Sequence, residues 1–338
     1  MKRAVRNLTF LSVVSLCLIL LLVKNSDPDQ RFIVIDRTNA AFTVSPAGSI
    51  AFPGKISLVQ VSGHYIYGYV HKQGSIYRYD LLRHRLETFI GAADSMAGTT
   101  NGLQVAPDAP VVYRFTTSGR QVLLYRLDGS LADSIVCNDH PYVKGVKGLG
   151  TGTFIFQWYD TAKVASMLKL VHYGSQPADS VIYTFPHFDD GGISEDGQFI
   201  CQPATGDVYF IPFYNSRIIR YNQGQNRLYN IVTIDSTPPA NVTLHTSSGY
   251  FISSKALLLN SAATADSGHL YLLSYARAGN DAQQRVNVDV YAVAGSRYQG
   301  TISLPAPPTG AVLSLAKSGD TLFVSSVEKV MMYKLEAR

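Results

Sequence analysis

The chain has 338 residues, of which 46% are hydrophobic and 16% charged, and its formal net charge is +5. Its three cysteines are too few for a fold that depends on disulfides. Part of the positive charge belongs to Lys2, Arg3, Arg6 and Lys24, and the rest of the chain is close to neutral. We therefore find no basic footprint of a nucleic-acid-binding protein.

The first residues have the pattern of a targeting segment. Lys2, Arg3 and Arg6 precede an apolar run from Leu8 to Val23, which as a helix at about 1.5 Å per residue would be about 24 Å long. We predict a signal-anchor helix in residues 1–25, with the positive charges on the cytoplasmic side and the rest of the chain facing the periplasm or the cell exterior. A cleaved signal and a secreted product is the alternative. Residues 26–30 are predicted to be a short polar linker.

Residues 31–338 are predicted to form one all-β domain built from repeats. A short apolar strand that ends in an aromatic residue is followed by a polar turn and a second strand, and this phrase occurs six times. The marker aromatics are Tyr79, Tyr125, Tyr173, Tyr221, Tyr291 and Tyr333, at intervals of 46, 48, 48, 70 and 42 residues. A period of about 40–50 residues made of short strands is typical of propeller blades. A β-sandwich with coincidental spacing is the alternative.

On this blade pattern, of which Ile76-Tyr-Arg-Tyr-Asp80 is the clearest copy, the chain resembles the six-bladed β-propellers of the NHL and TolB-like type. The resemblance covers residues 31 to 338 and implies a fold. It does not imply one function, because members of this type include ligand-binding, scaffold and hydrolytic proteins.

Two features of the chain predict how the ring departs from a simple repeat. The segment Arg31 to Asp36 is predicted to be a strand, which Ala41 to Val44 continues, and to serve as the outer strand of the last blade. Closure by strands from both termini would leave no open edge between the first and last blades. The interval of 70 residues contains Asp235 to Lys255, which we interpret as an inserted loop or hairpin over one face.

The remaining cysteines and aromatics have structural explanations. Cys137 and Cys201 fall in different predicted blades, so we expect two buried free thiols rather than a disulfide. Tyr65, Tyr67 and Tyr69 alternate along one strand and are expected to pack between blades. Trp158, the single tryptophan, is either a core residue or a stacking residue that faces the axial channel.

Potentially reactive side chains gather in two of the loops that join one predicted blade to the next. The candidate ligand-binding residues are Asn138, Asp139, His140, His187, Asp189, Asp190 and Trp158. In the functional interpretation they bind a polar ligand or a cation, or His140 and His187 act as acid and base. In the alternative interpretation Asn138, Asp139 and Asp189 form hydrogen bonds with the backbone of their own turns. We predict no cofactor and assign no catalytic or metal-binding residue, because no known catalytic motif or metal-ligand spacing is present.

We therefore expect a membrane-anchored, extracytoplasmic six-bladed β-propeller that binds a protein, peptide or saccharide on its loop face and has no catalytic activity. The competing hypothesis is a metal-assisted hydrolase or lyase with its site at the mouth of the channel. A third possibility is a structural component of the cell envelope. A bound divalent ion near Asp139 and Asp189 would favour the enzyme, whereas an exposed apolar patch on the Asp235 to Lys255 insert would favour binding.

Overall fold

The computed structural model describes most of the predicted β domain. The described residues are 15, 35–40, 42–70, 73, 75–90, 100–105, 111–116, 121–126, 128–136, 143–149, 153–172, 178–202, 205–247, 249–254, 256–274, 285–305, 312–327 and 329–337. The predicted signal anchor lies outside this set, apart from Ser15. Within the set, no helix has both the length and the apolar character needed to cross a bilayer.

Within the described residues, the strands form six four-stranded antiparallel sheets and one two-stranded sheet. We number the four-stranded sheets as blades one to six. Blade one is β2 (Ile56–Ser62), β3 (Tyr65–Val70), β4 (Ser75–Asp80) and β5 (Arg85–Ile90). Blade two is β6 (Thr100–Val105), β7 (Val111–Thr116), β8 (Gln121–Arg126) and β9 (Leu131–Val136). Blade three is β10 (Val143–Gly148), β11 (Thr153–Asp160), β12 (Ala165–His172) and β13 (Ala178–Thr184).

The second half of the chain continues this pattern. Blade four is β14 (Gly197–Cys201), β15 (Val208–Pro212), β16 (Arg217–Asn222) and β17 (Arg227–Val232). Blade five is β20 (Asn260–Ala265), β21 (His269–Ser274), β22 (Arg285–Ala292) and β23 (Tyr298–Pro305). Blade six is β24 (Ser314–Ser318), β25 (Thr321–Ser325), β26 (Lys329–Ala337) and β1 (Phe42–Ala51). The two-stranded sheet is the hairpin of β18 (Thr243–Thr246) and β19 (Gly249–Ile252).

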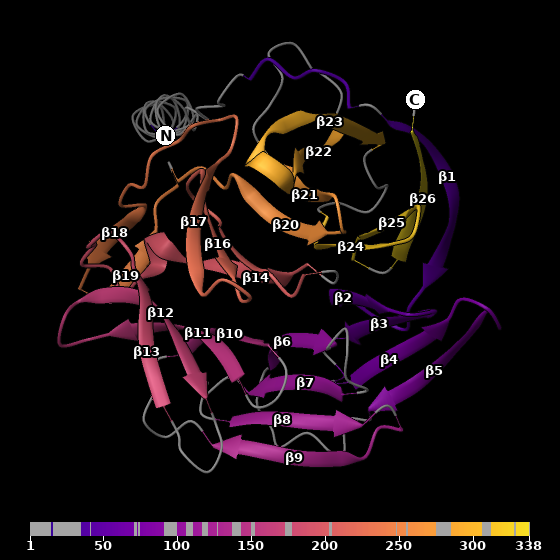
Figure 1. The fold of residues 1–338 in the computed structure, drawn as a ribbon, viewed down its shortest axis with the longest axis horizontal. Helices are drawn as coiled ribbons and strands as arrows, with labels where there is room; N and C mark the ends of the chain where they lie inside the picture. The colour runs from indigo at the N-terminus through magenta and orange to yellow at the C-terminus, as the bar shows by residue number, and fades with distance from the viewer. Residues whose placement is uncertain are drawn as a thin grey trace, which may run out of the picture.

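The sheets are arranged in a ring around a central axis (Figure 1). The first strand of each blade contacts the first strands of both neighbouring blades, in the order β2, β6, β10, β14, β20, β24 and back to β2. The predicted β-propeller is therefore confirmed. Five of the six predicted marker aromatics lie at or near the end of the third strand of a blade, and the sixth, Tyr173, is outside the described residues.

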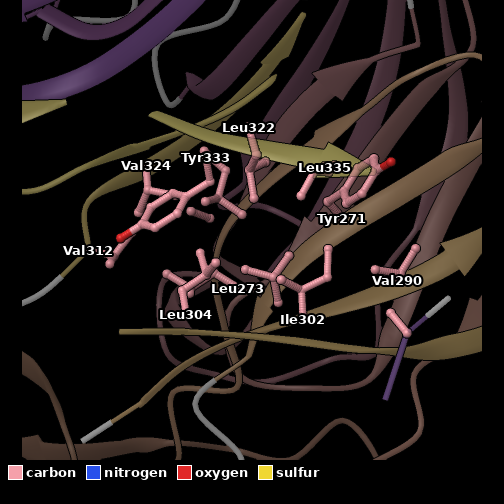
Figure 2. Close-up of a cluster of buried hydrophobic side chains, with 14 residues drawn as sticks. Tyr271, Leu273, Val290, Ile302, Leu304, Val312, Leu322, Val324, Tyr333 and Leu335 are labelled. Atoms are coloured by element: carbon pink, nitrogen blue, oxygen red, sulfur yellow. The ribbon is translucent and has the colours of Figure 1, made fainter. Parts of the chain in front are cut away.

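The core consists of apolar clusters between adjacent blades. In the largest one, Val288 and Val290 of blade five pack against Leu322 and Tyr333 of blade six (Figure 2). Further clusters join blades one and two, three and four, four and five, and six and one. A four-stranded sheet cannot bury both of its faces alone, so adjacent blades bury them together. The predicted packing of Tyr67 and Tyr69 between blades is confirmed, since both join Leu123 and Tyr125 of blade two.

The ring closes where β1 pairs with β26 at the outer edge of blade six. Closure by strands from both termini is confirmed, but the predicted strand Arg31 to Asp36 is wrong as the closing strand. Within it, Ile35 and Asp36 are described and lie outside any strand. The outer strand is instead Phe42–Ala51, whose pairing is interrupted by a bulge between Pro46 and Gly48. Proline has no N–H to donate. A strand at the edge of a sheet tolerates this loss, because it has a hydrogen-bonding neighbour on one side only.

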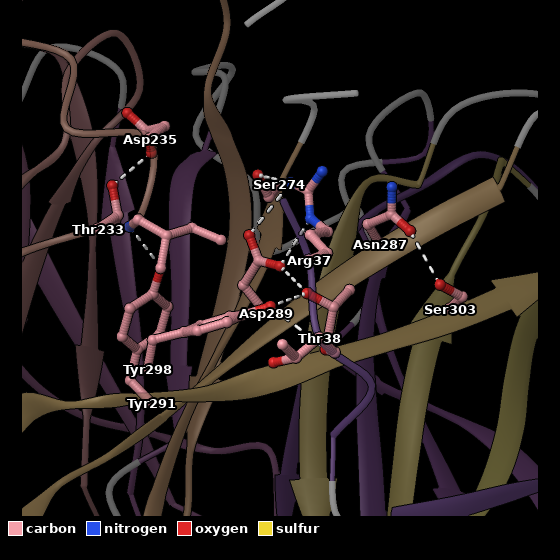
Figure 3. Close-up of polar contacts among 12 residues, drawn as sticks. Arg37, Thr38, Thr233, Asp235, Ser274, Asn287, Asp289, Tyr291, Tyr298 and Ser303 are labelled. Atoms are coloured by element: carbon pink, nitrogen blue, oxygen red, sulfur yellow. Dashed lines mark hydrogen bonds and ion pairs between the residues drawn. The ribbon is translucent and has the colours of Figure 1, made fainter. Parts of the chain in front are cut away.

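Residues 35–40, which we call the N-terminal strap, lie against the outer strand of blade five before the chain enters blade six. Asn39 and Thr301 form an isolated parallel bridge, and Thr301 donates its N–H to Thr38 O at 2.7 Å. Arg37 reaches further in and forms an ion pair with Asp289 on β22, with 3.0 Å between Nε and Oδ1 (Figure 3). The strap therefore attaches the segment before β1 to blade five, in addition to the pairing of β1 within blade six.

Gly300 makes the close contact between the strap and β23 possible. Its φ is +127°, and a Cβ at this position would lie 2.5 Å from the Cα of Ala40. We expect Gly300→Ala to lower the free energy of unfolding by about 2 kcal/mol or more, because it combines backbone strain with a backbone clash. Urea denaturation of the variant measures this loss.

Gly319 provides the control. It also has a positive φ, of +55°, but a Cβ there would meet no atom within 4 Å. Gly319→Ala should therefore cost about 1 kcal/mol, from backbone strain alone. Equal losses in the two variants would contradict the contact that we assign to the strap.

Candidate functional site: the loop face beside the inserted hairpin

The loop that joins blade three to blade four contains three of the predicted site residues. It runs from the end of β13 to the start of β14 and includes the short 3-10 turn η3 (Ile193–Glu195). His187 and Asp189 are exposed, whereas Asp190 is fully buried. His187 and Asp189 are therefore the members of this loop that a ligand can reach directly.

Asp190 organises this loop through its carboxylate. Oδ1 accepts a hydrogen bond from the N–H of Gly192 and Oδ2 accepts one from the N–H of Ser194, both at 2.8 Å. Gly191 and Gly192 have φ values of 66° and 76°, which glycine adopts without the strain that a Cβ would add. The turn-stabilising role that the alternative interpretation gave to Asp189 therefore belongs to its neighbour Asp190.

The inserted hairpin docks on the same loop. The hydroxyl of Tyr250 in β19 donates to Oδ1 of Asp189 at 3.0 Å, and the N–H of Val242 donates to Oγ of Ser194 at 2.9 Å. The prediction of an insert at Asp235 to Lys255 is confirmed, since β18 and β19 lie within it. In Figure 1 the hairpin lies at the periphery of the ring, beside blades three and four.

Acidic groups crowd the buried side of the loop. Glu195 is 2% exposed, and its backbone oxygen accepts a hydrogen bond from Nε2 of Gln157 at 2.7 Å. Burial, followed by the nearby charge of Asp190, raises the pKa of Glu195 to about 8. Burial, followed by Asp189 and Asp190, raises the pKa of the Tyr159 hydroxyl. The carboxyl of Glu195 is therefore protonated at neutral pH.

The hairpin presents apolar side chains to solvent. Leu244, Phe251 and Ile252 are 55%, 51% and 54% exposed. Leu244 and Phe251 are paired across the two strands, so they project from the same face of the hairpin. His245 and Tyr250, the next pair, lie on the opposite face, where Tyr250 contacts Asp189. Ile252 pairs with Thr243 and therefore lies on that opposite face as well. We call Leu244 and Phe251 the hairpin patch.

The remaining predicted site residues do not join this group. Asn138, Asp139 and His140 lie outside the described residues. Trp158 lies on β11, the second strand of blade three, with the ammonium of Lys169 4.2 Å from its ring centroid. Because β10, and not β11, is the strand nearest the axis, this position is that of the packing interpretation.

Metal ligands and thiols are limited within the described ranges. These ranges hold no group of three His, Cys, Asp or Glu side chains placed to bind one ion. Cys201 is partly buried rather than fully buried, and its thiol donates to Gln202 O at 3.7 Å. Cys137 lies outside the described residues, so the expected pair of separate thiols stays a prediction.

Two residues of this site were missed by the sequence analysis. Tyr250 reaches Asp189 from 61 residues further along the chain, a pairing that no local pattern encodes. Glu195 lies in the stretch Ser194-Glu-Asp-Gly-Gln198, whose composition is typical of an exposed turn. The signal available for the hairpin was the apolar character of Tyr250-Phe-Ile252 inside the insert.

Comparisons with known proteins find likeness in structure only. The sequence matches no protein-family profile and no curated protein sequence. A member of the DUF4221 family from Bacteroides vulgatus superposes with a TM-score of 0.57 at 7% identity, covering 88% of this chain and 99% of its own. A protein from Bacteroides fragilis that is inferred to be exported superposes with a TM-score of 0.55 at 8% identity. The match covers 90% of this chain and 97% of that protein.

Virginiamycin B lyase from Staphylococcus aureus gives a TM-score of 0.50 at 11% identity, with 87% of this chain and 100% of the lyase covered. The likeness is one of fold. At these identities it shows a β-propeller and assigns no activity, substrate or partner to this chain.

Proposed function

We propose that this chain is a non-catalytic binding protein that recognises a protein or peptide through the hairpin patch and the loop beside it. The observation that carries the proposal is the exposure of more than half of both Leu244 and Phe251, which lie side by side on one face of the hairpin. Because each is already about half buried, covering the rest would contribute roughly 1 kcal/mol per side chain to association. Scattered single apolar residues need no explanation, but two large ones paired on one face of a short hairpin do.

The surroundings of the patch support a protein partner over a saccharide. An interface has an apolar centre and a polar rim, and here the exposed Thr246 follows Leu244 on the same face of the hairpin. An aromatic anchor such as Phe251 beside an aliphatic side chain such as Leu244 is the kind of centre that dominates binding energy in protein interfaces. A saccharide would instead require several converging hydrogen-bonding groups.

The proposal includes the location of the protein. Residues 1–25 would anchor it as a single span, and the propeller would face the periplasm or the cell exterior. Lys2, Arg3 and Arg6 before the apolar run support this orientation. The Bacteroides fragilis protein that is inferred to be exported has a similar fold. The proposal also includes a ring of six blades, which the six four-stranded sheets support. The NHL or TolB-like type of propeller is part of it as well.

The test is capture of partners from an envelope extract by the tagged full chain in detergent. We expect a stoichiometric partner with the wild type and at least about a tenfold loss of it in the double variant Leu244→Ser, Phe251→Ser, since two central apolar anchors are removed. Leu82→Ser is the matched control, because Leu82 is 73% exposed on the turn after β4 in blade one.

Equal capture by the double variant would contradict the proposal. So would a stoichiometric divalent ion in the purified chain together with loss of that ion in His187→Ala. That result would favour the metal-assisted hydrolase or lyase.

A further inference from the structure

The face opposite the hairpin contains a cavity that the proposed function does not use. Its volume is about 470 Å³, and its walls are the last residues of β2, β14, β20 and β24 with the turns that follow three of them. These strands begin at the loop face, so their ends open on the other mouth of the axial channel. A cavity of this volume is within the range of small-molecule sites, which is about 300–1,000 Å³.

Neutral hydrogen-bonding side chains line the cavity. They are Gln60, Ser62, Thr264, Ser267 and Ser318. Strand alternation explains two of them. Val59 and Val61 pack in the core between blades six and one, and Ala263 and Ala265 pack between blades four and five. Gln60 and Thr264 therefore face the axis.

The two charged groups in the wall neutralise each other. Lys317 Nζ of blade six lies 2.8 Å from Asp266 Oδ2 of blade five, and the Lys317 side chain is only 8% exposed. The ammonium also donates to Gly319 O at 2.5 Å. Asp266 Oδ1 accepts the N–H groups of Gly268 and His269, both at 2.8 Å, and Oδ2 also accepts the hydroxyl of Tyr271 at 2.9 Å.

The carboxylate of this pair is held in its ionised form. Burial opposes ionisation of Asp266, but the hydrogen bonds from Lys317 and from the N–H of Gly268 outweigh it and lower its pKa to about 2. Within this cavity the carboxylate and the ammonium are each other's counter-charge. A charged ligand here would lose hydration without gaining a counter-ion of its own.

A second, smaller cavity of about 260 Å³ shares Asp266, Ser267 and Lys317 with the first. Phe42 and His269 also line it, with their rings edge to face at 5.4 Å. So does Asp320, whose carboxylate has its own counter-charge in Lys334 at 3.7 Å. The ion pair of Lys317 and Asp266 thus lines both cavities. Hydroxyl and amide groups line the larger one, and aromatic rings line part of the smaller one. Sugar rings have both properties, since their hydroxyls form hydrogen bonds while their C–H faces pack on apolar surface.

We propose that this mouth of the channel, the axial pocket, binds a neutral saccharide of one to three sugar units. Gln60, Ser62, Thr264 and Ser318 would form hydrogen bonds with its hydroxyl groups, and Phe42 and His269 would contact a terminal ring. This site is independent of the hairpin patch, so the failure of either proposal leaves the other standing.

The experiment is titration of the full chain in detergent with glucose and maltotriose, followed by saturation-transfer NMR and calorimetry. Glucuronate and glucosamine are the charged counterparts. We expect saturable binding of a neutral probe and at least about tenfold weaker binding of the charged ones, since a charge in this pocket is desolvated without a partner.

Variants locate the binding. Thr264→Trp would fill the pocket and should weaken neutral-sugar binding by at least about tenfold, as steric exclusion requires. Thr246→Trp on the hairpin is the control and should leave it unchanged. Cys201 lines the pocket, so a bound sugar should also slow its alkylation by iodoacetamide, measured by peptide mass spectrometry on the wild-type chain. That measurement decides the matter if Thr264→Trp does not fold.

Three results would overturn the proposal. They are no saturable binding of either neutral probe, equal binding of neutral and charged probes, and binding that leaves the alkylation rate of Cys201 unchanged.

Discussion

Arg37→Ala is expected to lower the free energy of unfolding by about 3–5 kcal/mol, the usual cost of removing one partner of a buried ion pair. The side chains of Arg37 and Asp289 are 6% and 3% exposed, so water cannot replace the guanidinium. Arg37 Nη2 also donates to Oγ of Ser274 at 3.0 Å, and the hydroxyl of Thr301 donates to Asp289 (Figure 3). In the variant, Thr301 remains but the carboxylate has no counter-charge.

Two further variants separate the charge from the general effect of truncation. Adding Asp289→Asn to Arg37→Ala removes the unpaired charge and should restore part of the lost stability. Arg83→Ala breaks a pair with Asp80 in which Arg83 is 81% exposed, and such a surface pair contributes about 0–1 kcal/mol. Urea denaturation at pH 7 measures all three. If Arg37→Ala loses no more than Arg83→Ala, the strap does not fasten the ring.

Glu195→Gln is expected to abolish a large part of the pH dependence of stability between pH 5 and pH 8. The pKa of Glu195 is about 8 in the folded protein, against an ordinary value of 4.5 for a glutamate side chain. Because the folded state holds its proton more tightly, the stabilisation is complete below pH 4.5 and is lost as the pH rises towards 8. The loss is about 1.4 kcal/mol per pH unit in this window, or about 3 kcal/mol between pH 5 and pH 7.

The measurement is the urea midpoint of the wild type and the variant at pH 5, 7 and 8.5. The side chain of Glu195 forms a hydrogen bond with Asn215, so an amide at position 195 could have a fixed cost at every pH. This cost cancels when the difference in stability between the two proteins at pH 5 is subtracted from their difference at pH 8.5. Glu336→Gln is the control, since the side chain of Glu336 is 62% exposed. An identical pH profile in the wild type and Glu195→Gln would refute the burial of this carboxyl at the base of the loop.

The repeat could be predicted because a blade encodes its own local pattern. A third strand such as Ser75–Asp80 has to fill the space between blades and then turn, so it carries apolar residues, an aromatic near its end and a polar turn. The hairpin insert was equally visible, since it lengthens one interval between markers. These features depend on residues adjacent in sequence.

The closing strand could not be placed from local pattern. Phe32-Ile-Val-Ile35 has stronger strand propensity than Phe42–Ala51, which contains Pro46 and Gly48. Pairing with β26, together with a bulge at Pro46 and Gly48, nevertheless selects the second segment. The partner lies almost a full chain length away, so tertiary contact overrides propensity here.

The loop site shows the same limit in its chemistry. Asp189 and Asp190 are adjacent and were predicted to share one role, but one is exposed and bound to Tyr250 while the other is buried in a turn. Sequence identifies the acidic loop but not which carboxylate faces solvent. Glu195 is protonated because of burial by blades three and four, which no window of sequence contains.

The most direct test of the central claim is site-specific photo-crosslinking in cells with a photoreactive residue in place of Phe251. Our account predicts a discrete crosslinked product with one partner protein at position 251 and none at Leu82, which is more exposed than Phe251. The absence of any product at position 251, or the same product at both positions, would contradict recognition through the hairpin patch.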